Sequence, residues 1–126
     1  MRGAGDEARE RDAAEVDAVL DDLAAQGLLS DERYARSVVL RKAASHSARA
    51  ITDTLKAHGV GDDAVRQALA ERETDDDTVM RMLWQRRFGE PPRDERDKAR
   101  QVRFLQSRGF GLSAILRFLR TAVHEE

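Results

Sequence analysis

Cysteine is absent from this chain of 126 residues. Its absence excludes disulfide bonds, cysteine-ligated zinc and thiol catalysis, and it fits a reducing compartment. Long apolar runs are missing too. None approaches the ~20 residues that a membrane-spanning helix needs, and residues 1–12 have no apolar core of the kind that marks a signal peptide. We therefore expect an unanchored, cytoplasmic protein that forms one compact unit, since typical domains run to roughly 100–200 residues.

Aromatic residues are scarce, at 5% of the chain, whereas charged residues make up 37%. With 40% apolar residues, the chain can bury a core only if these are regularly placed. Their spacing is helical: Val16, Val19, Leu20 and Leu23 follow the pattern i, i+3, i+4, i+7 on one helix face. Alternation typical of strands is missing, so the sequence predicts an all-α protein with roughly six to eight helices and no sheet.

Glycines and capping residues divide the chain into these helices. The first helix is expected to end at Gly27, and Ser30 is expected to cap the next. Thr74 and Asp77 resemble a capping box for a later helix. Ser47 and Asp62 are expected to open two further helices, and the helix after the capping box carries Val79, Met82, Leu83 and Phe88. A sharp break at Gly89, Pro91 and Pro92 precedes a helix from about Asp94 to Ser107 and a last one that carries Leu112, Ile115, Leu116, Leu119 and Val123. The predicted core residues are Val16, Leu20, Leu23, Ile51, Leu55, Leu69, Leu83, Leu105, Leu116 and Leu119.

A weak internal repeat accompanies the predicted turns. A leucine, three residues, a glycine and an apolar residue recur at 23–28, 55–60 and 105–110. The apolar residue after the glycine can pack back on the helix that has just ended. The intervals between the glycines are unequal, which favours stacked helical modules over a strict solenoid. Chance matches in any protein of short helices are the alternative.

Charge is distributed unevenly along the chain, although its net value is only −2. Residues 1–80 hold 11 basic and 18 acidic side chains, and residues 81–126 hold 11 basic and 6 acidic ones. Such asymmetry indicates that the C-terminal part faces something anionic. Two other interpretations stay open: the two halves attract each other, or the arginines are simply solvated.

An arginine stripe is the best functional signal in the sequence. Arg93, Arg96, Arg100 and Arg103 fall within about 80° of arc on a helix. Arginine suits carboxylates and phosphates alike, so a protein patch and a DNA backbone are both plausible targets. The alternative is a solvated face with local acidic partners at 94, 95 and 97. The candidate partner-binding residues are Arg33, Arg36, Arg86, Arg87, Arg93, Arg96, Arg100, Arg103 and Arg108.

Catalysis and metal binding are not expected. His46, His58 and His124 lie far apart, and none has a serine or an acid at a telling spacing. The acidic run at 75–77 suits the first turn of a helix better than a metal site, because consecutive helical residues fan apart. Tyr34 and Trp84 are interpreted as core residues rather than as contacts. We expect a non-enzymatic protein with no cofactor and no metal.

Four stretches together resemble the RecX family. They are Gly27-Leu-Leu-Ser-Asp-Glu-Arg-Tyr-Ala35, Ile51-Thr-Asp-Thr-Leu-Lys-Ala-His-Gly-Val60, Arg87-Phe-Gly-Glu-Pro91 and Val102-Arg-Phe-Leu-Gln-Ser-Arg-Gly-Phe110. Their order and spacing are similar to that family over residues 13–123. The chain departs from the family at Ser45-His46-Ser47, where members tend to have a glycine–aromatic–glycine turn, and at Ala50, where an arginine is usual.

The resemblance implies tandem three-helix repeats that form an elongated, curved array. It assigns residues 1–12 to a polar stub, 13–44 to a partial first repeat, 45–90 to a second repeat and 91–126 to two helices of a third. It also implies a non-enzymatic regulator that binds the RecA recombinase or its DNA filament and restrains strand exchange, ATP turnover and filament growth, within DNA repair and the SOS response. The competing hypotheses are a direct nucleic-acid-binding helical module and an adaptor for an unrelated partner.

The start of the chain carries one more expectation from the resemblance. Family members usually open with a further helix, and residues 1–11 look like the stub of a shortened form. The stripe of Val16, Val19, Leu20 and Leu23 then lacks one usual partner. Exposed apolar stripes seek cover, so we expect either self-association through this end or a mobile first helix.

Overall fold

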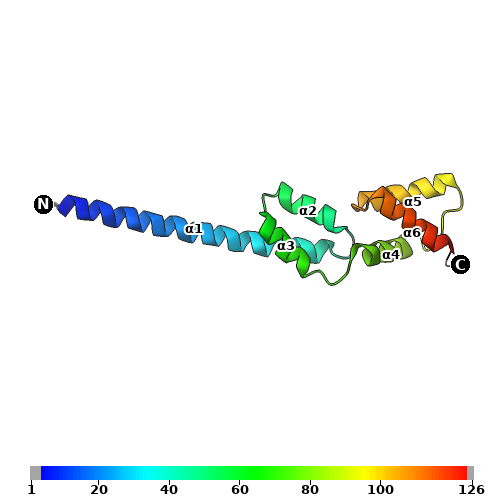
Figure 1. The fold of residues 1–126 in the computed structure, drawn as a ribbon, viewed down its shortest axis with the longest axis horizontal. Helices are drawn as coiled ribbons and strands as arrows, with labels where there is room; N and C mark the ends of the chain where they lie inside the picture. Colours follow the sequence, from blue (N-terminus) through cyan, green and yellow to red (C-terminus); the bar gives the residue numbers. More distant parts are fainter. Residues whose placement is uncertain (1–3, 125–126) are drawn as a thin grey trace.

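The computed structural model describes residues 4–124, with the side chains of residues 7–122. Its described part is all-helical and contains no strand, which confirms the predicted fold class. The six helices lie along an elongated molecule, with the N-terminus at one end and α5 and α6 at the other (Figure 1). None of these helices combines the length and apolar character needed to cross a bilayer. Their bounds are α1 Ala4–Lys42, α2 Ala48–Ala57, α3 Asp62–Ala70, α4 Asp76–Arg87, α5 Glu95–Ser107 and α6 Leu112–His124.

Helix α1 is one continuous rod, and the predicted break between Gly27 and Ser30 is wrong. Every side chain from residue 9 to residue 30 is exposed, so no neighbouring helix offers buried contacts that would stabilise a turn there. A glycine inside a helix costs only about 1 kcal/mol relative to alanine. The good helix formers around Gly27 therefore carry the helix through it, and the rod projects beyond the rest of the protein (Figure 1).

The first apolar cluster joins the C-terminal end of α1 to α2 and α3. It consists of Ala35, Val38, Val39, Ile51, Leu55, Val60, Val65 and Ala68. Tyr34 packs against this cluster, and its ring stacks on His58 at a centroid distance of 4.0 Å. The placing of Tyr34 at a core was therefore correct. We call α1 from residue 30 together with α2 and α3 the first unit.

The second apolar cluster joins α4, α5 and α6, which we call the second unit. Its buried residues are Val79, Met80, Leu83, Trp84, Leu105, Phe110, Ile115, Leu119 and Ala122. Trp84 is a core residue, as predicted. The two apolar clusters divide the chain between α3 and α4. The division into repeats at 13–44, 45–90 and 91–126 that the family resemblance implies stays a prediction.

Half of the predicted core residues are buried. They are Ile51, Leu55, Leu83, Leu105 and Leu119. Leu69 and Leu116 are half-buried. The prediction is wrong for Val16, Leu20 and Leu23, which are 56–57% exposed because the part of α1 that holds them packs on no other helix.

The repeated glycine motif forms the α2–α3 and α5–α6 turns. Gly59 and Gly109 have φ values of 89° and 96°, a conformation that side chains other than glycine rarely adopt. In each turn the residue after the glycine donates its N–H to the carbonyl of the motif's leucine, at 3.0 Å for Val60 and 3.2 Å for Phe110. Both of these apolar residues are buried, as the motif predicted for these two copies.

Helix α4 begins one residue later than the sequence indicated. The predicted cap pairing Thr74 with Asp77 is wrong: the N-cap is Asp75, whose carboxylate accepts a 2.8 Å bond from the N–H of Thr78. That bond is the main reason why the pKa of Asp75 lies below its ordinary value. A carboxylate at this position offers a stronger cap than a hydroxyl, because it also opposes the positive end of the helix dipole.

Polar contacts at the start of α2 hold the two units together. Ser47 caps α2, and its hydroxyl donates to the carbonyl of Gly109 at 2.8 Å. Its backbone N–H donates to the carbonyl of Arg108 at 2.9 Å. Asp76 of the second unit accepts a 2.9 Å bond from the N–H of Ala48. These bonds join the first turn of α2 to the α5–α6 turn and to α4, and they set how one unit meets the other.

Candidate partner-binding surface

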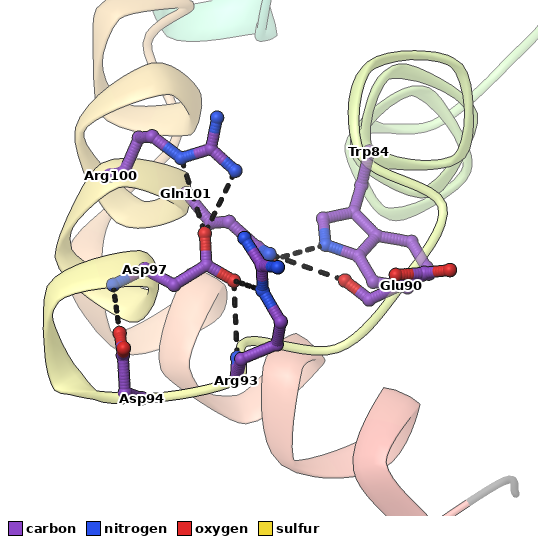
Figure 2. A network of polar contacts seen from close by, with 7 residues as sticks. All are labelled: Trp84, Glu90, Arg93, Asp94, Asp97, Arg100 and Gln101. Atoms are coloured by element: carbon purple, nitrogen blue, oxygen red, sulfur yellow. Dashed lines mark hydrogen bonds and ion pairs between the residues drawn. The ribbon is translucent and has the colours of Figure 1, made fainter.

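A buried amide fixes the turn between α4 and α5. Figure 2 shows Gln101 between Trp84 and the backbone of Glu90. The indole N–H of Trp84 donates to Oε1 of Gln101 at 2.8 Å, and Nε2 of Gln101 donates to the carbonyl of Glu90 at 3.2 Å. Gln101 is 1% exposed. Because a buried amide is stable only when its polar atoms are bonded, Gln101 ties both helices and their turn into one arrangement.

Asp97 organises the first turn of α5 around it (Figure 2). Its N–H donates to the N-cap carboxylate of Asp94 at 2.7 Å. Its own carboxylate accepts from Nη2 of Arg100 at 2.8 Å and from the backbone N–H of Arg93 at 3.1 Å, and the Nε of Arg93 lies 3.9 Å from it. The bond from Arg100 is the main cause, and the bond from Arg93 the second cause, of a pKa for Asp97 below its ordinary value. Asp97 therefore stays ionised and holds two arginines at the surface.

Two phenylalanine rings hold three further guanidinium contacts. The rings of Phe88 and Phe104 meet edge to face, with centroids 5.5 Å apart. The guanidinium carbons of Arg87 and Arg108 each lie 5.3 Å from the centroid of Phe104, and that of Arg100 lies 5.1 Å from the centroid of Phe88. Each such contact is worth about 0.5–1 kcal/mol at an exposed site. The rings thus reduce the freedom of these arginines before any partner arrives.

The four arginines of the predicted stripe line one shallow depression. Its volume is ≈ 330 Å³, and it is lined by Arg93, Asp94, Arg96, Asp97, Arg100 and Arg103. The guanidinium groups of Arg93 and Arg100 both form ion pairs with the carboxylate of Asp97, at 3.9 Å and 2.8 Å. Within residues 7–122, Arg96 and Arg103 have no carboxylate partner. The expected acidic neighbours therefore neutralise half of the stripe and leave the other half available to a partner.

The remaining candidate arginines divide between two places. Arg87 and Arg108 join the stripe through Phe104. Arg86 is exposed in the last turn of α4. Arg33 and Arg36 are exposed on α1 in the first unit, apart from the arginines of α4 and α5. We call Arg87, Arg93, Arg96, Arg100, Arg103 and Arg108 the arginine face.

Sequence reasoning missed the residues that position this face. Gln101 carries no signal in sequence, because a glutamine in a charged helix is usually exposed. Phe88 and Phe104 are not among the predicted core or partner-binding residues, although Phe88 follows Arg87 and Phe104 follows Arg103 in the sequence. Two aromatic residues, each preceded by an arginine, are a signal for cation–π stacking, although only the packing of α4 on α5 decides which arginine meets which ring.

The histidines do not form a site in the described part of the chain. His46 lies in the turn before α2, where its Nδ1 is 2.7 Å from the hydroxyl of Ser45. Burial first, and then the charges of Lys42 and Arg108, lower the pKa of its ring. No group of three histidine or acidic side chains among these residues converges on a point where a metal ion could bind.

Comparisons with known proteins match both units. Residues 30–69 match the family model described as RecX, second three-helix domain, and residues 75–119 match RecX, third three-helix domain. These ranges agree with the division of the apolar core between α3 and α4. No solved structure matches the chain significantly.

Curated proteins named "Regulatory protein RecX" are similar over most of the chain. One from Leptothrix cholodnii is 46% identical over 114 residues, which cover 90% of this chain and 73% of that protein. One from Ralstonia nicotianae is 38% identical over 86% of this chain and 68% of its own length. One from Pseudomonas putida is 39% identical over 94% of this chain and 73% of its own. With such identity spread across both units, this chain belongs to the RecX family.

Proposed function

We propose that this chain is a non-enzymatic, cytoplasmic regulator that binds the RecA recombinase filament and inhibits its recombination and ATPase activity. Membership of the RecX family is the observation that carries the proposal. The resemblance implies an array of three-helix repeats that lodges along the groove of the RecA–DNA filament. A regulator of this kind acts in recombination, DNA repair and the SOS response.

The arginine face supports the proposal with a surface of suitable chemistry. Arg96 and Arg103 are exposed and have no carboxylate partner in the described residues. Arg87 and Arg108 are held against Phe104 and present guanidinium groups of restricted orientation. Restricting a side chain before binding reduces the entropy lost on binding. Such a surface fits carboxylates on a protein partner, which arginine contacts with two parallel hydrogen bonds.

Charge favours a protein partner over naked nucleic acid. The chain has a net charge of −2, and residues 1–80 hold 18 acidic side chains against 11 basic ones. That acidic half repels a phosphate backbone, whereas a dedicated nucleic-acid-binding domain is basic over one whole face. A direct nucleic-acid-binding module is therefore the second hypothesis. A chain that binds RecA and also contacts DNA weakly is a third arrangement between the two.

The test is the DNA-dependent ATPase of RecA, titrated with this protein and with two matched variants. Arg96→Glu with Arg103→Glu reverses two charges on the arginine face, and Arg33→Glu with Arg36→Glu makes the same change on the first unit. All four arginines are exposed, so folding should be preserved in both variants. We expect the first variant to need at least about tenfold more protein for half-inhibition, a loss of about 1.4 kcal/mol. The second variant should inhibit like the parent chain.

Four outcomes would contradict part or all of the assignment. If the parent chain left the ATPase unchanged, regulation of RecA would be wrong. If both variants inhibited as the parent does, the arginine face would be a solvated surface. If only the variant at residues 33 and 36 lost inhibition, the interface would lie on the first unit. Binding to DNA without RecA, with a steep inverse dependence on salt, would favour the nucleic-acid hypothesis.

A further inference from the structure

The projecting part of α1 has the chemistry of a ligand for a basic, partly apolar surface. Residues 12–32 contain seven acidic side chains and no basic one. One side of this segment carries Val16, Val19, Leu20 and Leu23, which are 56–58% exposed. No other helix of the described chain covers them, and Figure 1 shows the segment extending away from both units. An exposed amphipathic helix of one charge sign is a typical element for docking into a groove of the opposite sign.

The same segment of a second copy is a poor cover for this stripe. Parallel pairing would place seven carboxylates beside seven carboxylates. Antiparallel pairing centred on Asp22 would still oppose residues 12–22 with residues 22–32, which hold only acidic charges. Like charges at close range destabilise helix pairs. The stripe therefore needs a different surface, with apolar and basic side chains side by side.

Such a surface lies between the start of α5 and α6, at the opposite end of the molecule. A depression of ≈ 400 Å³ has apolar walls at Pro92, Leu116 and Leu119 and basic side chains at Lys98 and Arg120. Arg93 also lines it and is the residue that it shares with the arginine face, and the acidic residues Asp94 and Glu95 line it as well. Helix α6 contains no acidic residue between 112 and 124. We call this depression the α5–α6 groove.

We propose that residues 12–32 of one copy dock in the α5–α6 groove of a second copy. The apolar stripe of α1 covers Leu116 and Pro92, and the flanking carboxylates meet Lys98 and Arg120. This interaction explains the charge asymmetry of the chain, because the acidic N-terminal half of one molecule attracts the basic C-terminal half of another. It involves Lys98, Leu116 and Arg120, which lie outside the arginine face.

The geometry makes this contact intermolecular. Because α1 is a continuous rod, residues 12–32 of one molecule point away from its own α5 and α6 (Figure 1). A contact between two different surfaces is heterologous, so each added copy leaves one helix and one groove unoccupied at the ends. The expected product is a series of head-to-tail oligomers that lengthens with protein concentration.

The test is sedimentation velocity of the full chain over a range of concentrations, with one variant for each side of the contact. Leu20→Gln with Leu23→Gln makes half of the apolar stripe polar and keeps good helix formers. Lys98→Glu with Arg120→Glu reverses the charge of the groove. Leu29→Gln with Leu40→Gln is the matched control, since both leucines are exposed on α1 and neither belongs to the apolar stripe. Circular dichroism checks that each variant is folded.

We expect the parent chain and the control to form oligomers, and each of the first two variants alone to be a monomer. An equimolar mixture of those two variants should form a dimer and nothing larger, because only one functional helix and one functional groove remain. Raising NaCl from about 0.1 M to about 1 M shortens the screening length from ~10 Å to ~3 Å and should weaken association of the parent chain.

Other results would overturn the proposal. A parent chain that stays monomeric at every concentration excludes the contact. Oligomers of the groove variant alone would mean that α1 pairs with itself or with another surface. Two monomeric variants whose mixture stays monomeric would mean that helix and groove are not partners. The ATPase test of the arginine face is independent of all three, since its variants change neither Lys98 nor Arg120.

Discussion

The two units each consist of three helices, but they differ in their core side chains and in the contacts of their surface residues. The first unit buries aliphatic side chains from alanine to leucine, and the second buries Trp84, Met80 and Phe110. The second unit also contains a buried amide, Gln101, that bonds to the indole and to the α4–α5 turn. Around the first unit, the stacked pair of Tyr34 and His58 is the counterpart of the arginine contacts on Phe88 and Phe104.

This difference shows how one helical repeat acquires a specialised surface. The core of the first unit consists of aliphatic side chains, which do not fix the orientation of the charged side chains on its surface. In the second unit, aromatic rings extend from the core to the surface, where their faces attract guanidinium groups. The core of the second unit therefore helps to arrange its arginines, which makes packing and binding chemistry interdependent there.

The largest expected difference in stability between the two units concerns Gly59 and Gly109, which hold the same position in their turns. Alanine at either position adopts a positive φ, which costs about 1–2 kcal/mol. A Cβ at Gly59 meets nothing within 4 Å, whereas one at Gly109 overlaps Ser47 and Ala50 of the first unit. Crowding of this kind adds about 1–3 kcal/mol. We expect Gly109→Ala to lower the free energy of unfolding by about 2–5 kcal/mol and Gly59→Ala by only about 1–2 kcal/mol, measured by urea denaturation. Equal losses would mean that the two units do not touch at Gly109.

The buried amide should give the next largest effect. Gln101→Ala leaves the indole N–H of Trp84 and the carbonyl of Glu90 without these partners. An unsatisfied buried polar group costs about 1–3 kcal/mol, and the unfolding free energy should fall by about that amount. Gln106→Ala, an exposed site on the same helix, is the control and should change little. The emission of Trp84, the chain's one tryptophan, reports both variants. A neutral Gln101→Ala would show that water replaces the amide at no cost.

A smaller effect is expected from the aromatic support of the arginine face. Phe104→Leu keeps an apolar side chain but removes the ring that holds Arg87 and Arg108. With less restricted arginines, inhibition of the RecA ATPase should need about twofold to fivefold more protein, within the range of one cation–π contact of about 0.5–1 kcal/mol. Tyr34→Leu makes a similar change in the first unit and should leave inhibition unaltered. Identical titrations for both variants would contradict a positioning role for Phe104.

The smallest expected difference is sensitivity to acid. In the second unit, hydrogen bonds lower the pKa values of Asp75 and Asp97 from the ordinary value of 3.8, whereas the first unit caps α2 with Ser47 and α3 with Gly61. A carboxyl with a lower pKa when folded stabilises the protein fully above 3.8 and loses that contribution as pH falls through the folded value. We expect Asp97→Asn to be less stable than the parent at neutral pH, with the gap closing below about pH 4. Denaturation monitored at Trp84 across this range measures the gap, and a constant gap would exclude the ionised form of Asp97 as its origin.

Sequence periodicity predicted the helices that have a partner and failed for the segment that has none. Ile51, Leu55, Leu105 and Leu119 are buried as expected, since their stripes face other helices. The stripe containing Leu20 has the same spacing and is exposed. Periodicity shows which side of a helix is apolar, but it does not say whether the chain provides a surface to cover that side.

Most of the arginine stripe was predictable for a similar reason. Arg96, Arg100 and Arg103 share a face of α5 because of their helical spacing. Arg93 precedes the N-cap of α5, and it lines the same depression beside the carboxylate of Asp97. The contacts of Arg87 and Arg108 with Phe104 were not predictable, because they depend on how α4 packs on α5 and on where the α5–α6 turn places Arg108. Whether this face binds a partner stays a prediction.

The three copies of the glycine motif show which features the sequence determines and which depend on tertiary packing. Sequence alone places a glycine four residues after a leucine at 27, 59 and 109, and an apolar residue after each. Two copies become turns, because Val60 and Phe110 are buried against the helices that pack there. At the third, Leu28 is 65% exposed and α1 continues through Gly27. Glycine permits a positive φ at little cost, but only burial of the following side chain against a neighbouring helix makes the turn more stable than the continuing helix.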